Sequence, residues 1–192
     1  MKERTYTIRG VRPLVMHNEQ LADPLNKWAK LVAEISKKRK KTEDDLHEMS
    51  RREWFGGLYY SEDLGIHMPE RCLERLLRDG ASKEKRGRDV LSALIVMDPA
   101  PLVYKGPKEP AKLWETGNFL LRATVGQNGK RIVRSRPIFP EWSLTFTVSY
   151  DESVLNEGDI DRFLAVAGRL CGLGDWRPKH GRFEVEPQKG AK

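Results

Sequence analysis

The fold depends on one stretch near the end of the chain, residues 168–185, which reads GRLCGLGDWRPKHGRFEV. A helical pattern leads into this stretch and a strand pattern leads out of it, so its glycine-rich segment connects a helix to a strand. Glycine adopts positive φ and lets another backbone or a ligand come close. Basic side chains around Trp176 suit a phosphate chain that carries stackable bases. The sequence leaves open whether this loop binds nucleic acid or only turns the chain.

The composition describes a polar globular protein. Its 192 residues are 39% hydrophobic and 33% charged, and 35 Lys and Arg against 28 Asp and Glu give a net charge of +7. A chain of this length predicts one domain with a buried core, and the positive charge favours a polyanionic partner. There is no apolar run of about 18 residues, which a membrane span would need, and no apolar signal segment at the start. We therefore predict a cytoplasmic protein with no membrane partner, in which Cys72 and Cys171 are reduced core thiols.

The strand patterns are clearest just before the last helix. From Trp142 to Tyr150 apolar residues alternate with Ser and Thr, which predicts a half-buried strand with one hydroxyl-lined face. Residues 159–171 then have apolar residues at helical spacing, and residues 182–186 are predicted to form the final strand. Near the start of the chain, residues 5–16 are predicted to form the first strand.

A helical insertion is predicted at residues 18–57. Its first helix starts at Asp23 with proline next and ends in the basic run 37–41. Its second helix starts at Thr42 with a capping box and stops at the glycine pair that ends with Gly57. The basic run suits either a solvated helix end or a patch that contacts phosphates.

The middle of the chain mixes all three kinds of element. Residues 58–68 are predicted to form a short hairpin, and residues 68–78 a helix that starts at a proline. Residues 90–97 are apolar and β-branched, which predicts a central strand. Residues 98–141 are an excursion with several prolines, and it contains a hairpin finger that turns at residues 126–129. The solvent face of the predicted helix contains Arg71, Arg75 and Arg78.

Local motifs do not support an enzyme. The sequence has no phosphate-binding loop motif, no dinucleotide fingerprint and no nucleophile elbow. Its four histidines are dispersed, and no spacing of Cys and His suits zinc. We therefore predict no cofactor and no metal.

The order strand, helix, strand, strand, helix, strand, with insertions, predicts an α+β fold of modified ferredoxin-like type, as in RNA-recognition domains. Three stretches carry a more specific likeness: residues 7–14, residues 67–78 and the loop 172–183. Together they resemble the RAMP superfamily, which includes the backbone subunits of CRISPR effector complexes, in a small phage or prophage form. The resemblance implies RNA or single-stranded DNA as partner, a thumb-like finger at the hairpin, and copies that assemble side by side as a homo-oligomer along the strand.

The predicted function is therefore single-stranded nucleic-acid binding, mostly through phosphates. Loop glycines would let the backbone approach the strand, and Trp176 or His180 would stack a base. The predicted binding residues are Arg122, Lys130, Arg131, Arg134, Arg136, Trp176, Arg177, Lys179, His180 and Arg182, with the loop glycines Gly172, Gly174 and Gly181.

Three alternatives stay open at this point. In the first, Trp176 is buried and Arg177 pairs with a carboxylate such as Asp175 or Glu141, so that the loop is only structural. In the second, the chain is a metal-independent endoribonuclease with His17 as general base. In the third, the chain is a protein-interaction module of phage origin, and its basic charge is incidental.

Overall fold

The chain forms two compact units. The structure, a computed structural model, describes residues 1–127 and 129–187, without the side chains of Gln127 and Lys130. Unit 1 comprises Met1–Leu14, Tyr60–Lys105 and Phe139–Lys192, and unit 2 comprises Val15–Tyr59 and Gly106–Ile138. The sequence was interpreted as one domain with insertions at 18–57 and 98–141. The first falls within unit 2 and the second overlaps it, so these segments form a compact body of their own.

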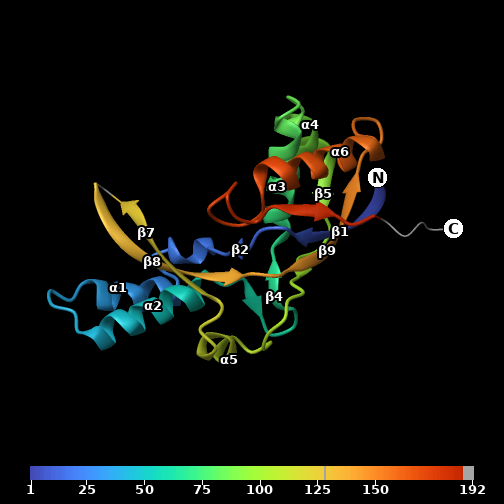
Figure 1. The fold of residues 1–192 in the computed structure, drawn as a ribbon. Helices are drawn as coiled ribbons and strands as arrows, with labels where there is room; N and C mark the ends of the chain where they lie inside the picture. Colours follow the sequence, from blue (N-terminus) through green and yellow to red (C-terminus); the bar gives the residue numbers. More distant parts are fainter. Residues whose placement is uncertain (128, 188–192) are drawn as a thin grey trace. The chain divides into compact units, whose positions relative to one another are not determined.

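Unit 1 is organised around a four-stranded antiparallel sheet in the order β10-β1-β9-β5 (Figure 1). The strands are β1 (Lys2–Gly10), β5 (Leu94–Val96), β9 (Ser143–Tyr150) and β10 (Phe183–Val185). The long β1–β9 pair runs from Lys2 opposite Tyr150 to Arg9 opposite Ser143. With its helices, this sheet makes the protein an α+β structure, as the sequence predicted.

The two faces of this sheet differ as the alternation in residues 142–150 predicted. Thr5 and Thr7 of β1 lie opposite Thr147 and Thr145 of β9, and each hydroxyl pair is 2.8 Å apart. A strand directs successive side chains to opposite faces, so the residues between these threonines lie on the other face, which is apolar and buried. Its members are Tyr6, Ile8, Leu144, Phe146, Val148 and Tyr150.

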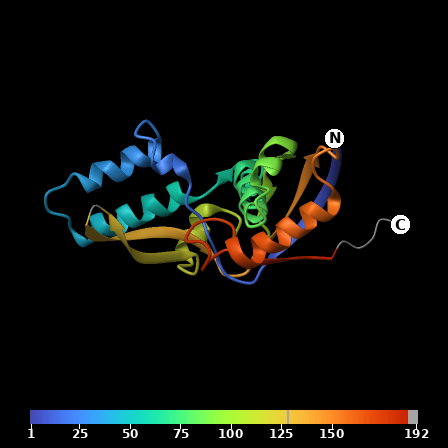
Figure 2. The ribbon, with the colours of Figure 1, turned by 90° about the horizontal axis from the view of Figure 1, so that it is seen from above.

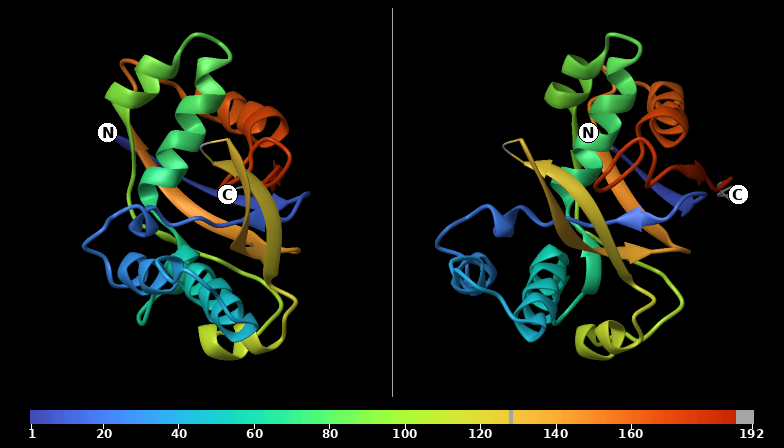
Figure 3. Two further views of the ribbon diagram at one scale, coloured as in Figure 1. Left: turned by 90° about the vertical axis from the view of Figure 1, so that its left-hand side faces the viewer. Right: turned by 60° about the vertical axis from the view of Figure 1, so that its left-hand side comes forward.

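Two helices cover the apolar face. Figure 3 shows α3 (Glu70–Ser82) crossing the strands, and α6 (Glu157–Val166) packs beside it and continues into the π-helical turn η2 (Ala167–Cys171). Gly80 permits this packing, because a Cβ there would lie 2.2 Å from the carbonyl oxygen of Phe163. The helix α6 is capped by a capping box formed by Asn156 and Asp159, and its first residue, Glu157, lies two residues before the predicted start.

The predicted central strand 90–97 is wrong in two respects. Its first half belongs to the short helix α4 (Gly87–Ala93), and the rest is β5, at the edge of the sheet. An apolar run this short does not distinguish a buried strand from a helix. Leu91 of α4 is 71% exposed and Ile95 of β5 is 50% exposed, so this segment is not a fully buried central strand. A second, smaller sheet in unit 1 joins β3 (Tyr60–Ser61), β4 (Gly65–Met68) and β6 (Ala100–Pro101).

Unit 2 combines a helical hairpin with a β-hairpin. In Figure 2 the helices α1 (Lys27–Ser36) and α2 (Glu43–Gly57) lie side by side. The hairpin strands β7 (Leu120–Gln127) and β8 (Lys130–Phe139) pair along their length, and β2 (Leu14–Val15) pairs with β8. The shorter helices are η1 (Glu19–Leu21) and α5 (Pro110–Glu115).

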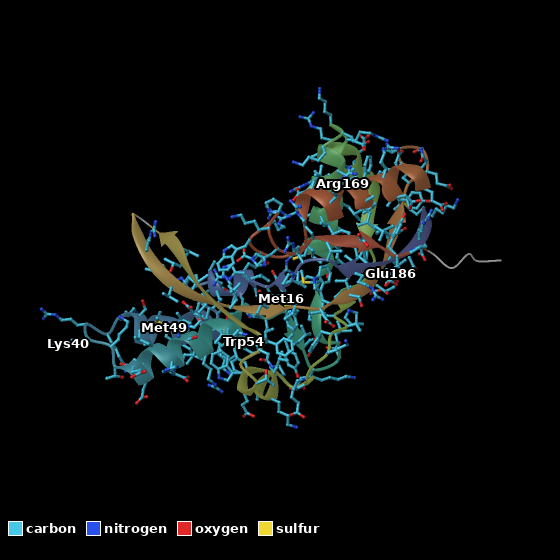
Figure 4. The ribbon with its side chains drawn as sticks, viewed as in Figure 1. Met16, Lys40, Met49, Trp54, Arg169 and Glu186 are labelled. Atoms are coloured by element: carbon cyan, nitrogen blue, oxygen red, sulfur yellow. The ribbon has the colours of Figure 1, made fainter. Side chains whose placement is uncertain are left out.

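Aromatic side chains from the three α-helices form the centre of unit 2. Trp54, labelled in Figure 4, is fully buried, and its indole N–H donates to the Phe119 carbonyl at 2.7 Å. Trp28 stacks on Phe55 with ring centroids 5.6 Å apart, and Trp114 contacts both Trp54 and Phe55. These rings hold α1, α2 and α5 together.

Local signals located the start of α2 well and the start of α1 poorly. The capping box at Thr42 is present, as predicted. The cap of α1 is Asn26, whereas Asp23 accepts a hydrogen bond from the backbone N–H of Leu25 in the turn before the helix. The predicted strand 5–16 is interrupted after Gly10 and resumes as β2. Among the described residues, no helix is long and apolar enough to cross a membrane.

Candidate nucleic-acid interface

The glycine-rich loop of unit 1 closes on its own backbone. Gly172, Gly174 and Gly181 all have positive φ, at 77°, 82° and 70°, which is the region that favours glycine. The Leu173 N–H donates to the Gly181 carbonyl at 2.8 Å. A Cβ on Gly181 would lie 1.8 Å from the Leu173 carbonyl oxygen, and one on Gly172 would lie 2.5 Å from that of His180. These two glycines are therefore required by backbone packing within the loop.

The end of the loop is also tied to the segment that follows β1. The Gly181 N–H donates to the Pro13 carbonyl at 2.8 Å, and the N–H groups of Val11 and Arg12 both donate to the Arg182 carbonyl. The expectation that the glycines make room for a nucleic-acid strand is thus corrected at Gly172 and Gly181, because the chain itself fills that space.

Trp176 and His180 form the aromatic part of the loop. Both are half-buried, and their ring centroids are 6.1 Å apart at an interplanar angle of 49°. Trp176 has a φ of 54°, which is costly for a bulky residue and persists only where the surroundings hold it. The His180 N–H donates to the Trp176 carbonyl at 3.2 Å, and the Arg182 side chain donates to the Pro178 carbonyl at 2.8 Å. The loop thus presents two partly accessible rings in a fixed conformation.

Arg177 is paired with a carboxylate of α3. Its Nη1 lies 2.9 Å from Asp79 Oδ2 on α3, whereas the sequence suggested Asp175 or Glu141. The alternative that Arg177 pairs with a carboxylate is therefore confirmed, with Asp79 as a partner that the sequence did not indicate. Lys179, in the same loop, is exposed.

Asp79 also pairs with two guanidinium groups from its own helix. Arg78 Nη2 is 3.4 Å from Asp79 Oδ1, and Arg75 Nε is 3.8 Å from Asp79 Oδ2. The side chains of Arg75 and Arg78 are 62% and 42% exposed, and Arg71 lies on the same helix face because it precedes them by about one and two turns. We call this group the basic surface, which consists of Arg71, Arg75, Arg78, Lys83 and Arg177.

The buried thiol of Cys171 lies near three charged side chains that shift its pKa. Burial raises the pKa of this thiol, with Lys83 and Arg177 lowering the pKa and Asp79 raising it. These three charged groups therefore lie close to the end of η2. Arg169, labelled in Figure 4, is exposed on the same turn.

The β7–β8 hairpin of unit 2 presents only part of its predicted set of basic residues. Arg122 pairs with Ser135 and Arg131 with Gly126, which places both arginines on one face of the hairpin. Both are exposed. The side chain of Lys130 lies outside the part of the chain that the structure describes.

Arg134 and Arg136 are corrected from binding residues to structural ones. Arg134 Nη1 lies 2.5 Å from Glu53 Oε1, and the Ser135 N–H donates to Glu53 Oε2 at 2.9 Å. The hydroxyls of Ser50 and Ser135 are 2.6 Å apart. Arg136 is only 8% exposed. A buried carboxylate needs such partners, so Arg134 helps to join β8 to α2.

His17, the general base of the ribonuclease alternative, lies two residues after β2. Its side chain is half-buried, and its carbonyl accepts a hydrogen bond from the Tyr59 hydroxyl at 3.2 Å. Among the described residues, no cluster of His, Cys, Asp and Glu is arranged to hold a metal ion. The ribonuclease hypothesis stays a prediction.

Sequence reasoning singled out the loop and the hairpin but missed the contribution of α3. The spacing of Arg71, Arg75 and Arg78 placed them on one helix face, and this signal alone would have identified a basic stripe. Nothing local connected that stripe to Arg177, because Asp79 lies 98 residues before it in the chain. Neither a protein-family model nor a curated protein matches the chain.

Proposed function

We propose that the chain is a single-stranded nucleic-acid-binding protein on a modified ferredoxin-like fold. Apart from the short helix α4 and the small sheet of β3, β4 and β6, unit 1 follows the order β1, α3, β5, β9, α6 and β10, and β9 lies between β1 and β5. A strand inserted between the two strands of a β-α-β unit is the split arrangement of ferredoxin-like folds, which supports the proposed fold. The likeness to the RAMP superfamily and side-by-side assembly of copies along the strand belong to the same proposal.

The observation that carries the proposal is the basic surface. Three of its arginines, Arg75, Arg78 and Arg177, pair with the single carboxylate of Asp79, and the side chains of Arg75 and Arg78 are 62% and 42% exposed. Such an excess of positive charge attracts a polyphosphate chain and releases its counterions. Guanidinium groups suit this role because their planar donors match phosphate oxygens. The partly accessible rings of Trp176 and His180, in the loop that also contains Arg177, would stack bases.

A salt titration with charge-matched variants tests the proposal. The double variant Arg75→Ser, Arg78→Ser removes two cations from the basic surface. The control Lys2→Ser, Lys105→Ser removes two exposed cations elsewhere in unit 1. Binding of labelled single-stranded RNA and DNA is followed by fluorescence anisotropy from low to moderate salt.

We expect the arginine variant to bind at least ten times more weakly than the control variant. Its salt slope is expected to fall by about 1.4, because each phosphate contact on a single strand contributes about 0.7. No binding of the unmodified protein at low salt, or equal losses in the two variants, would contradict the proposal.

A further inference from the structure

Asp79 is held by three guanidinium groups from two separate segments. Arg177 approaches from the loop at 2.9 Å, Arg78 at 3.4 Å and Arg75 at 3.8 Å, and both carboxylate oxygens are used. The other carboxylate in the middle of α3, Glu74, accepts a hydrogen bond from the backbone N–H of Val96 at 3.1 Å. A single negative charge thus faces three positive ones, with Lys83 also close by.

This ratio leaves the arginines poorly neutralised. The arginine side chains are 24% to 62% exposed and that of Asp79 is 29% exposed, so water screens each pair and each contributes little stability. A phosphate group has more acceptor oxygens than a carboxylate, and arginine binds it with strong, charge-assisted hydrogen bonds. The arrangement therefore favours a phosphate over the carboxylate that is present.

We propose that Asp79 occupies the position of one phosphate group and competes with it for Arg75, Arg78 and Arg177. The ligand class is a phosphate, and its source is a backbone phosphate of the nucleic acid or a small phosphate compound. The nucleic-acid source rests on the proposed function, whereas the small-phosphate source does not. Asp79 holds the three arginines together while the position is empty and weakens binding when a phosphate arrives.

The sign of one substitution separates this role from an ordinary ion pair. Asp79→Asn keeps the size and shape of the side chain and removes its charge. If Asp79 competes, the variant binds phosphate about five times more tightly, which is the upper range for loss of an exposed ion pair. The salt slope on a single-stranded oligonucleotide increases by about 0.7, because one more phosphate is neutralised. If Asp79 only positions the arginines, the variant binds more weakly.

The control is Glu152→Gln, which makes the same change of charge in unit 1 at a carboxylate that pairs with Lys2 at 3.2 Å. Both variants are titrated with a labelled single-stranded oligonucleotide by anisotropy and with inorganic pyrophosphate by thermal shift. Asp79→Ser is a second neutral variant, in case the amide disturbs folding. The double variant Asp79→Asn, Arg177→Gln is expected to lose the gain, because Arg177 is the nearest donor.

A gain with both ligands supports the phosphate position, and a gain with the oligonucleotide alone supports it with the nucleic acid as source. A gain with pyrophosphate but no oligonucleotide binding by any variant supports it with a small phosphate as source and contradicts the proposed function. If neither neutral variant exceeds Glu152→Gln with either ligand, the inference is overturned, while oligonucleotide binding by the unmodified protein would still support the proposed function.

Discussion

Gly181 offers the sharpest test of what the glycine-rich loop is for. It has a φ of 70°, and a Cβ would lie 1.8 Å from the Leu173 carbonyl oxygen. Gly65, the first residue of β4 in the same unit, has a φ of 67° with nothing within 4 Å of its Cβ position. Gly181→Ala and Gly65→Ala therefore share the cost of a left-handed backbone and differ in steric contact.

The expected magnitudes follow from these contacts. The left-handed conformation costs alanine about 1–2 kcal/mol, and this applies to both variants. In Gly181→Ala the backbone must also separate, which disrupts the bond from the Leu173 N–H and the bond to the Pro13 carbonyl, each 2.8 Å long. At about 1 kcal/mol for each bond, the free energy of unfolding should fall by about 2 kcal/mol more than in Gly65→Ala. That difference corresponds to about 4–8 °C in Tm for a chain of this size.

Urea unfolding monitored by tryptophan fluorescence, together with thermal melts, measures this difference. If the two variants unfold within about 0.5 kcal/mol of each other, the backbone closure described for the loop is wrong. If Gly181→Ala keeps its stability and loses only nucleic-acid affinity, the glycine instead makes room for a ligand.

Three further predictions concern buried polar groups. Glu53→Ala is expected to lower the free energy of unfolding by about 2 kcal/mol, because it removes the carboxylate that accepts hydrogen bonds from Arg134 and from the Ser135 N–H of β8. Faster hydrogen exchange in β8 would show this loss, and unchanged exchange would contradict it. Burial alone would raise the pKa of Asp159, but hydrogen bonds from Arg86 and other groups lower this pKa below its ordinary value of 3.8. The stability that the charged carboxylate contributes is therefore present above pH 3.8 and lost as the pH falls through the lowered pKa. Asp159→Asn should be less stable at pH 7 and less sensitive to acid below the ordinary pKa, and parallel acid-unfolding curves would refute this. Burial raises the pKa of the Cys171 thiol and so reduces its reactivity. A disulfide reagent at neutral pH should therefore modify half-buried Cys72 first and Cys171 only on unfolding. Equal rates of modification in the folded protein would contradict the burial of Cys171.

Patterns within a few residues predicted much of unit 1 and parts of unit 2. The alternation from Trp142 to Tyr150 located β9 and both of its faces, and the spacing around Thr42 located the start of α2. The turn at residues 126–129 located the β7–β8 hairpin. These features are local because strand alternation, helix capping and tight turns arise from the sterics and hydrogen bonds of neighbouring residues. The sequence by itself therefore determined the α+β class and the kind of most elements.

The tertiary structure decided which charged residues are accessible. Arg134 and Arg136 were expected to bind phosphates, but Glu53 holds the former, and the latter is buried. Arg177 is held by Asp79, which belongs to a helix 98 residues earlier. Whether an arginine reaches solvent or a carboxylate depends on what distant segments bring beside it, and no local pattern encodes that.

The glycine-rich stretch 168–185 combines both cases. Its sequence determined that a helix ends there, that a loop with positive φ follows and that a strand comes next. Only the tertiary structure decided that Gly172 and Gly181 accommodate the loop's own backbone, and that Arg177 pairs with Asp79 of α3. The reason is that positive φ is a property of a single residue, whereas close approach requires a second segment whose position is set by the packing of the whole unit.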